Sequence, residues 1–275
     1  MSGAADTVRT VLRGLGQTLI TLGVVVLLFC VYELKITGLV TAREQDRLGD
    51  ELRRSWAEPV ARPAPVPDPP TSAPPASAAP APVPSAGPVP TAVPMPEPVP
   101  TAESVPPVEP VARGEGLAVL RVPRLGDWND EPPVVVEGVS VADLKRGPGH
   151  MPGTALPGEV GNVVLSGHRT TYGAPFQRLD ELDPGDAVVL ETRDSWFTYT
   201  VTGSRIVAPT AVEVAYPVPG DRGAMPTERL LTLTTCHPEY SARERLVVSA
   251  QLASADPKSG EPPAALRALS AAEGP

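Results

Sequence analysis

The sequence predicts an all-β domain, either a barrel or a sandwich. Seven short runs rich in Val, Thr and Leu lie between residues 117 and 252, and Gly, Pro and Asp turns separate them. Helix-forming segments within this region are short and are limited to Val141–Lys145 and Phe176–Leu182. Because no long amphipathic helices alternate with the strands, a doubly wound α/β fold is disfavoured.

The expected strands follow in chain order. Each combines β-branched or aromatic residues with a flanking turn signal, and LDPGD at 182–186 joins a short acidic helix to the strand that follows it. The strands are expected at 117–122, 133–138, 162–167, 186–192, 196–208, 229–236 and 245–252.

An apolar run from Leu15 to Tyr32 precedes this domain and has the length of a membrane-spanning helix. Arg9 and Arg13 come before it, so the positive-inside rule predicts a cytoplasmic tail at 1–14, an anchor at 15–34 and a folded domain on the extracellular side. A cleaved signal peptide is the alternative. The following ELKITGLVTAREQDRL offers no small-x-small cleavage site, which favours an uncleaved anchor in the cell membrane.

The region between anchor and domain divides in two. A polar pattern predicts a solvated juxtamembrane helix at 35–57. About 20 of the 37 prolines then lie between Pro59 and Pro110, which predicts a disordered linker at 58–113. Fully extended, this spacer reaches about 150 Å and would hold the domain far from the membrane. The folded domain is expected at 114–254, before a disordered tail at 255–275.

Composition excludes several functions. The net charge of −9 and the absence of a basic stripe argue against a nucleic-acid partner. The sequence has no Cys-x-x-Cys or His-x-x-His spacing, no phosphate-binding Gly-rich loop and no dinucleotide fingerprint, so no metal and no cofactor is expected. Cys30 lies in the apolar run, which leaves Cys236 as a free thiol in an exported domain.

Cys236 ends the strand-like LLTLTTC, where it is either a buried small hydrophobe or a nucleophile. A nucleophilic thiolate needs a nearby imidazolium or guanidinium. His168 is the preferred partner because VVLSGHR carries it from a strand into a loop, and His150 is the second choice. His237 is the immediate neighbour of the cysteine and therefore points to the opposite face of a strand.

The chain turns after Cys236 and re-enters a strand at Arg245. If the two strands form a hairpin, Arg243 or Arg245 can reach the sulfur and stabilise an oxyanion. Arg245 is preferred because Arg243 still lies in the turn. A solvated turn charge is the alternative for both residues.

These strings together resemble the active-site signature of sortases, the cysteine transpeptidases of Gram-positive cell surfaces. The strings are TLTTC at 232–236, RLVV at 245–248 and KRGPGHMPGTALPGEVGNVVLSGHRTTYGAPFQRLDEL at 145–182; the last resembles the actinobacterial class E enzymes. The resemblance implies a closed β-barrel of about eight strands with short helices. It assigns Cys236 as nucleophile, His168 as acid and base, and Arg245 as oxyanion donor, and it suggests that Thr235 lines the substrate groove.

The same resemblance implies the reaction and its partners. The enzyme would cleave the Thr–Gly bond of an LPxTG-like or LAxTG sorting signal and transfer the surface protein to an amine of a cell-wall precursor or a pilin. Two alternatives remain. One is an L,D-transpeptidase-like cross-linker, disfavoured because Leu-Thr-Thr rather than Ser-His-Gly precedes Cys236. The other is a non-catalytic wall-binding β-domain on a stalk.

Overall fold

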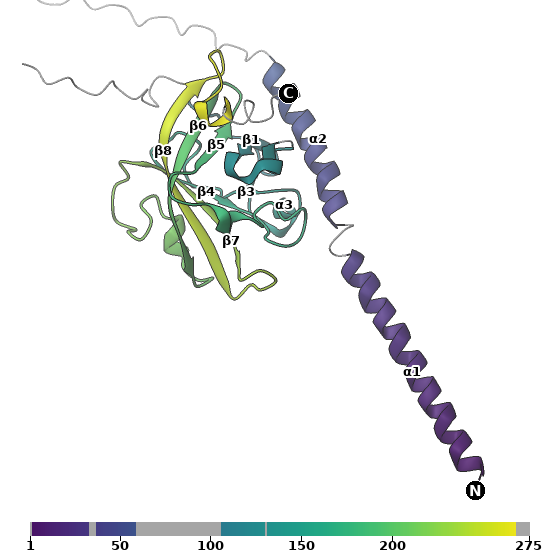
Figure 1. Cartoon of the computed structure of the whole chain (residues 1–275). Helices are drawn as coiled ribbons and strands as arrows, with labels where there is room; N and C mark the ends of the chain where they lie inside the picture. Colours follow the sequence, from purple (N-terminus) through teal and green to yellow (C-terminus); the bar gives the residue numbers. More distant parts are fainter. Residues whose placement is uncertain (1, 33–36, 59–105, 130, 268–275) are drawn as a thin grey trace, which may run out of the picture.

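The computed structural model of the protein describes residues 2–32, 37–58, 106–129 and 131–267, and a β-barrel is its main body (Figure 1). The Pro-rich linker predicted at 58–113 falls mostly on residues 59–105, and the tail predicted at 255–275 includes residues 268–275. Both of these stretches lie outside the described residues.

Two long helices, eight strands and four short helical turns make up the described chain. The long helices are α1 (Ser2–Val31) and α2 (Thr37–Ala57). The strands are β1 (Gly116–Arg121), β2 (Val134–Glu137), β3 (Gly149–His150), β4 (Gly161–Ser166), β5 (Ala187–Glu191), β6 (Ser195–Val207), β7 (Arg229–His237) and β8 (Glu244–Pro257). The short turns are η3 (Pro123–Asn129), α3 (Val141–Leu144), η4 (Leu179–Glu181) and η5 (Val212–Ala215).

The strands match the predicted runs within a few residues, with two differences. β3 has only two residues and leaves no periodic pattern in the sequence. β8 continues past the predicted boundary at residue 254, because Ala255 is buried in the core and pairs with Phe197 of β6. The helix expected at Phe176–Leu182 is reduced to the single turn η4.

The eight strands close into a barrel in the order β1-β2-β3-β4-β7-β8-β6-β5. Most neighbours are antiparallel, but β2 with β3 and β4 with β7 are parallel. The β4–β7 pairing is the important one for the site, because parallel strands end at the same edge of a sheet. The predicted closed barrel of about eight strands is therefore confirmed.

Alternation along the central strands separates the core from the outer surface. Leu231 and Leu233 of β7 and Leu246 and Val248 of β8 point into the barrel, where they join the main hydrophobic cluster. Side chains at the alternate positions consequently face outward. Cys236 and Arg245 occupy such outward positions at the end of β7 and the beginning of β8.

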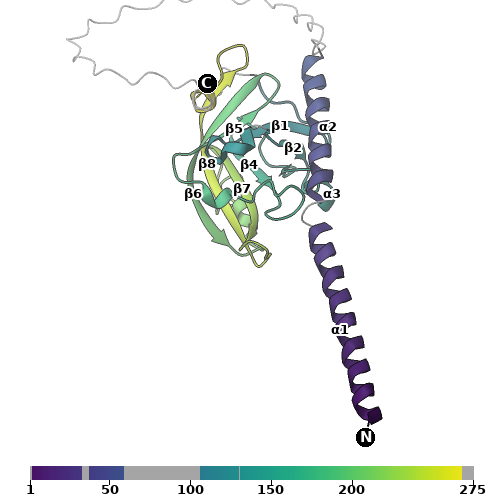
Figure 2. The same cartoon turned by 45° about the vertical axis from the view of Figure 1, so that its right-hand side comes forward.

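Helix α2 packs against β1 and β2 instead of standing free in solvent (Figures 1 and 2). Its Leu48 and Leu52 are buried against Val134 and Val136. The polar Gln45 adds to this contact, because its amide accepts from Val134 N at 2.6 Å and donates to Arg146 O at 2.6 Å. The solvated helix expected from the sequence is thus a helix with one face against the barrel.

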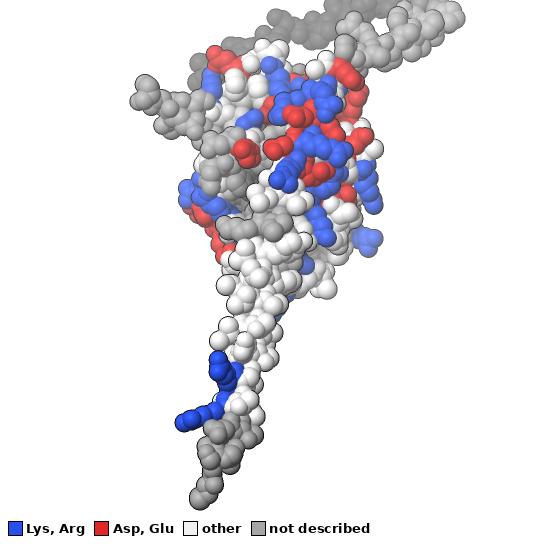
Figure 3. Space-filling view, turned by 90° about the vertical axis from the view of Figure 1, so that its right-hand side faces the viewer, with Lys and Arg blue, Asp and Glu red and all other residues white. Residues whose placement is uncertain are grey.

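Helix α1 contains the candidate membrane span Arg9–Val31, which is long and apolar enough to cross a bilayer and is exposed along its length. Figure 3 shows this stem almost entirely without charge apart from basic side chains toward its N-terminal end, whereas charges of both signs cover α2 and the barrel. The apolar helix is compatible with the single-pass anchor predicted from the sequence.

Candidate active site

Cys236 and Arg245 face each other across the β7–β8 ladder. The two residues are direct antiparallel partners, as the sequence predicts for a hairpin. Residues opposite each other on one face of a sheet have Cβ atoms about 5 Å apart, so their side chains share one patch of the outer surface. Cys236 is a half-buried free thiol. The Arg245 guanidinium lies over the turn, where Nη1 donates to Ala242 O at 3.1 Å and to Glu244 O at 2.9 Å.

His168 reaches the same edge through the parallel β4–β7 pairing. Ser166 is the partner of Thr234, and Gly167 N still donates to Thr234 O at 3.2 Å. The same register, continued by two more residues on each strand, brings His168 level with Cys236. Gly167 has no room for a side chain, because an added Cβ would lie 2.8 Å from the Phe176 ring. The three residues that the sequence singled out for catalysis therefore meet at one edge of the barrel.

The surroundings of His168 disfavour its charged form. Burial lowers the pKa of His168, and the positive charge of Lys145 lowers it further. The Tyr172 ring lies 5.0 Å from the His168 ring, and Lys145 Nζ lies 5.3 Å from the Tyr172 ring centroid. His168 Nε2 is buried, and no described residue forms a hydrogen bond with it. The hydrogen-bonding capacity of this nitrogen is therefore not used by the described residues.

Thr235 lies on the inner side of β7, opposite to Cys236. Its side chain is only 2% exposed, and its hydroxyl donates to Gly167 O at 2.8 Å. This bond fastens the chain just before His168 to the chain just before Cys236. Sequence analysis suggests that Thr235 lines the substrate groove. In the structure only its main chain belongs to the outer surface, because the alternation that exposes Cys236 buries this side chain.

Arg169 was missed by sequence analysis, although it belongs to the GHR string. Its side chain is 5% exposed, and its guanidinium reaches the end of β7, where Nη1 donates to His237 Nδ1 at 2.9 Å. The same nitrogen lies 3.5 Å from Cys236 O, and Nη2 pairs with Asp180 at 2.8 Å. Arg169 thus connects the residue after His168 to the main chain of Cys236, a link that only the three-dimensional structure shows.

The other two histidines, His237 and His150, form hydrogen bonds with other residues. His237 accepts a hydrogen bond at Nδ1 from the Arg169 guanidinium, so this ring nitrogen already has a partner. His150 is buried in β3, with Nδ1 2.6 Å from Glu137 Oε2 and Nε2 3.0 Å from Ala155 O. Since both ring nitrogens of His150 have partners, the second-choice histidine is a brace between β2 and the chain that follows β3.

Metal binding has no support in the described part of the chain, where no group of three or more His, Cys, Asp or Glu side chains converges. The site instead combines a thiol, an imidazole and a guanidinium on the rim of a closed barrel. Chemically, a thiol can act as a nucleophile, an imidazole can carry a proton and a guanidinium can donate hydrogen bonds to an oxyanion, which is the set of groups that a cysteine acyltransferase needs.

Comparison with known proteins identifies the family. Residues 120–253 match the model of the sortase domain. The structure of sortase E from Streptomyces avermitilis is 43% identical, with a TM-score of 0.51 over 57% of this chain and 100% of that chain. Sortase E1 from Streptomyces coelicolor with a tripeptide in the active site is 36% identical, with a TM-score of 0.51 over 56% of this chain and 99% of that chain.

Among curated relatives, sortase SrtE1 of Streptomyces coelicolor is 30% identical over 92% of this chain, and the match spans 60% of the length of that relative. The chain belongs to the sortase family of cysteine transpeptidases, and its relatives include class E enzymes, as the sequence strings predict.

Proposed function

We propose that the protein is a membrane-anchored transpeptidase that cleaves the Thr–Gly bond of LAxTG-like or LPxTG-like sorting signals and transfers the surface protein to an amine. The observation that carries this proposal is the direct cross-strand pairing of Cys236 with Arg245. The end of strand β4, which leads to His168, lies beside this pair. The amine belongs to a cell-wall precursor, or to a pilin where the product is a polymer. The catalytic domain lies on the extracellular side.

The first half of the reaction forms a thioester. The Cys236 thiolate attacks the Thr carbonyl carbon, and the carbonyl oxygen takes up the negative charge. Collapse of this intermediate breaks the Thr–Gly C–N bond, while the protonated form of His168, the minor form at neutral pH, gives its proton to the leaving glycine amine. The products are an acyl-enzyme on Cys236, a free amine and a neutral His168.

The second half reverses the proton transfer. The acceptor amine attacks the thioester carbonyl, and neutral His168 removes the proton that the new amide nitrogen loses. The C–S bond breaks, and the Cys236 thiolate and the His168 imidazolium are restored. Because the surroundings of His168 lower its pKa, the neutral ring that this step requires is the favoured form at neutral pH.

Arg245 has to change partners when substrate binds. Its Nη1 donates to the neutral carbonyls of Ala242 and Glu244. A negatively charged acceptor adds Coulomb attraction to a hydrogen bond from a guanidinium, so a developing oxyanion competes favourably with the neutral carbonyls for this side chain. The carbonyls of the turn therefore bind the Arg245 guanidinium until the oxyanion forms during the reaction.

The outer face of the sheet offers a place for the extended peptide. A hollow of about 440 Å³ lies on the same strands as the active site and is partly lined by Leu230, Thr232 and Ser249. The segment before β7 contributes Val218 and Pro219 to its wall. An apolar side chain of a sorting signal has room here, several residues along β7 from Cys236.

The test uses the whole chain in detergent with LAxTG and LPxTG peptides and an amine acceptor, followed by mass spectrometry. We expect a transpeptidation product, and we expect Cys236→Ala to abolish it without changing the melting temperature. Cys30→Ala is the matched control, because it removes the other thiol and should keep full activity. Retained activity in Cys236→Ala would refute the proposed mechanism.

A wall-binding domain without catalysis is distinguished by thiol chemistry. In Cys30→Ala the only thiol is Cys236. A methanethiosulfonate reagent should modify it rapidly in the native protein, and a sorting peptide should protect it. A native thiol that resists the reagent would favour the non-catalytic alternative.

A further inference from the structure

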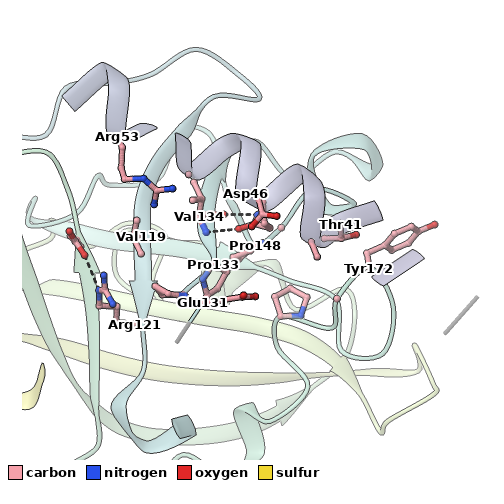
Figure 4. Close-up of a pocket in the computed structure, with 18 of the residues that line it drawn as sticks. Thr41, Asp46, Arg53, Val119, Arg121, Glu131, Pro133, Val134, Pro148 and Tyr172 are labelled. Carbon is pink, nitrogen blue, oxygen red and sulfur yellow. Dashed lines mark hydrogen bonds and ion pairs between the residues drawn. The ribbon is translucent and has the colours of Figure 1, made fainter. Parts of the chain in front are cut away.

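The first turns of α2 lie beside the active site. Thr41 donates its hydroxyl to Lys145 O at 3.0 Å, and an added Cβ on Gly173 would touch Thr41 Cγ2 at 3.5 Å. Tyr172, next to Gly173, lies 5.0 Å from the His168 ring. Figure 4 shows Thr41 and Tyr172 together at one end of a cavity of about 660 Å³ between helix and barrel. The N-terminal part of α2 is thus at the catalytic edge.

The last turn of α2 lies at the opposite edge. The Trp56 ring lies 4.2 Å from Lys258 Nζ, just beyond the end of β8. Arg245 is at the beginning of the same strand, which runs from Glu244 to Pro257. A helix of 21 residues is about 30 Å long. α2 therefore runs the height of the barrel, from the catalytic edge to the far edge.

The contact between α2 and the barrel is specific. Gln45 makes both a donor and an acceptor bond to the main chain of Val134, and Glu44 pairs with Arg146 at 2.8 Å. Leu48 and Leu52 are 1% and 6% exposed beneath these polar contacts. An apolar stripe flanked by matched hydrogen bonds fixes both the position and the direction of the helix.

The chain between α1 and α2 is too short to separate them widely. Six steps lead from Val31, the end of the candidate span, to Thr37, and at most they cover about 22 Å. Thr41 follows about 6 Å further along the helix. Together with the contacts around Tyr172, these limits place the catalytic edge within about 40 Å of the membrane end of α1.

The Pro-rich segment does not add to this distance. It leaves the barrel surface near Trp56 and returns near Pro106, and these two residues line the same cavity of about 370 Å³. Both ends of the segment are therefore held at one place on the folded unit. Its extended length of about 150 Å therefore does not add to the distance between the active site and the membrane.

We propose that α2, and not the Pro-rich segment, sets the position of the active site, and that it turns the edge with Cys236 and His168 toward the bilayer. The enzyme then acts on peptide segments presented close to the membrane surface. This inference deepens the proposed function and rests on its membrane anchor. It replaces the tall stalk that the sequence predicts with a short, rigid attachment.

The experiment measures the height of each edge by energy transfer. The full chain with Cys30→Ala and Cys236→Ala is reconstituted in phosphatidylcholine–phosphatidylglycerol vesicles that carry acceptor-labelled headgroups. A donor is attached at Ala242→Cys, on the catalytic edge, or at Ser259→Cys, on the far edge; both positions are exposed. We expect several-fold more transfer from position 242, because the two edges differ in height by about 30 Å.

Three variants make the result decisive. Gln45→Ala with Leu48→Asp, which undocks α2, should abolish the difference between the two positions. Arg47→Ala with Glu51→Ala, which removes an exposed pair on the same helix, should preserve it. Removal of residues 66–95 should change neither value. Equal transfer from both edges, more transfer from position 259, or a rise on shortening would overturn the proposal. Peptide cleavage in solution, measured with Cys236 present, tests the catalytic function separately.

Discussion

Arg169→Met is expected to damage catalysis far more than substrate binding. The substitution keeps most of the buried side-chain volume but removes the guanidinium that joins His237 and the Cys236 carbonyl to Asp180. No part of Arg169 has to touch the substrate for this effect. It acts as a positioning residue, because it is adjacent to His168 in the chain and reaches the main chain of Cys236.

The expected loss of stability in Arg169→Met depends on how exposed the partners of Arg169 are. The Asp180 side chain is 52% exposed, so its ion pair contributes only about 0.5–1 kcal/mol to stability. The charged hydrogen bond to His237 adds about 1.5–2 kcal/mol. We therefore expect the free energy of unfolding to fall by about 2–3 kcal/mol. A shift of about 1 Å between reacting groups costs about 100-fold in rate, and kcat should fall by about this factor.

Steady-state kinetics with a sorting peptide measure this effect, and thermal unfolding of the same samples measures stability. KM should stay within about threefold, because the lost interaction acts in the transition state and not on bound substrate. Arg169→Lys should recover part of the rate. Arg178→Met is the matched control: it also removes a cation near η4, one that pairs with Glu181 at 2.9 Å. An unchanged kcat in folded Arg169→Met would refute the reasoning.

Two further predictions concern the residues next to His168. In Lys145→Gln the loss of a positive charge should raise the pKa of His168, so an NMR titration should show its ring staying protonated to a higher pH; an unchanged or lower midpoint would contradict the electrostatic argument. Gly167→Ala should destabilise the protein by about 1–3 kcal/mol, because its Cβ meets the Phe176 ring at 2.8 Å, and a wild-type melting temperature would show that the ring moves aside freely.

Local sequence was sufficient to predict most strands and the catalytic candidates. Runs such as NVVLSG and RLLTLTTC combine β-branched residues with turn signals at their ends, and both form strands within one residue of the predicted limits. The hairpin argument also placed Arg245 opposite Cys236 correctly. These features depend on neighbours in the chain, which is why a single sequence contains them.

Features that depend on distant partners were not predictable in this way. Neither the parallel pairing of β4 with β7 nor the role of Arg169 follows from periodicity, because both are decided by segments more than 60 residues apart. The packing of α2 against the barrel was not predicted, for a related reason. Its contact face combines the apolar Leu48 and Leu52 with the polar Gln45, which contributes through hydrogen bonds to the main chain of Val134 and Arg146 and not through hydrophobicity.

The same polar contact is the reason why the proposed arrangement assigns the distance to the membrane to α2 and not to the Pro-rich segment. Composition correctly indicates that such a segment gains little from folding, but reach depends on where its two ends are held. An extended polymer separates a domain from a membrane only if nothing else connects the two. In the proposed arrangement α2 provides a second connection, through Gln45, Leu48 and Leu52, that is shorter than any extended form of the segment. In that arrangement the shortest structured connection sets the distance between active site and membrane, and it gives the active site a direction as well as a height.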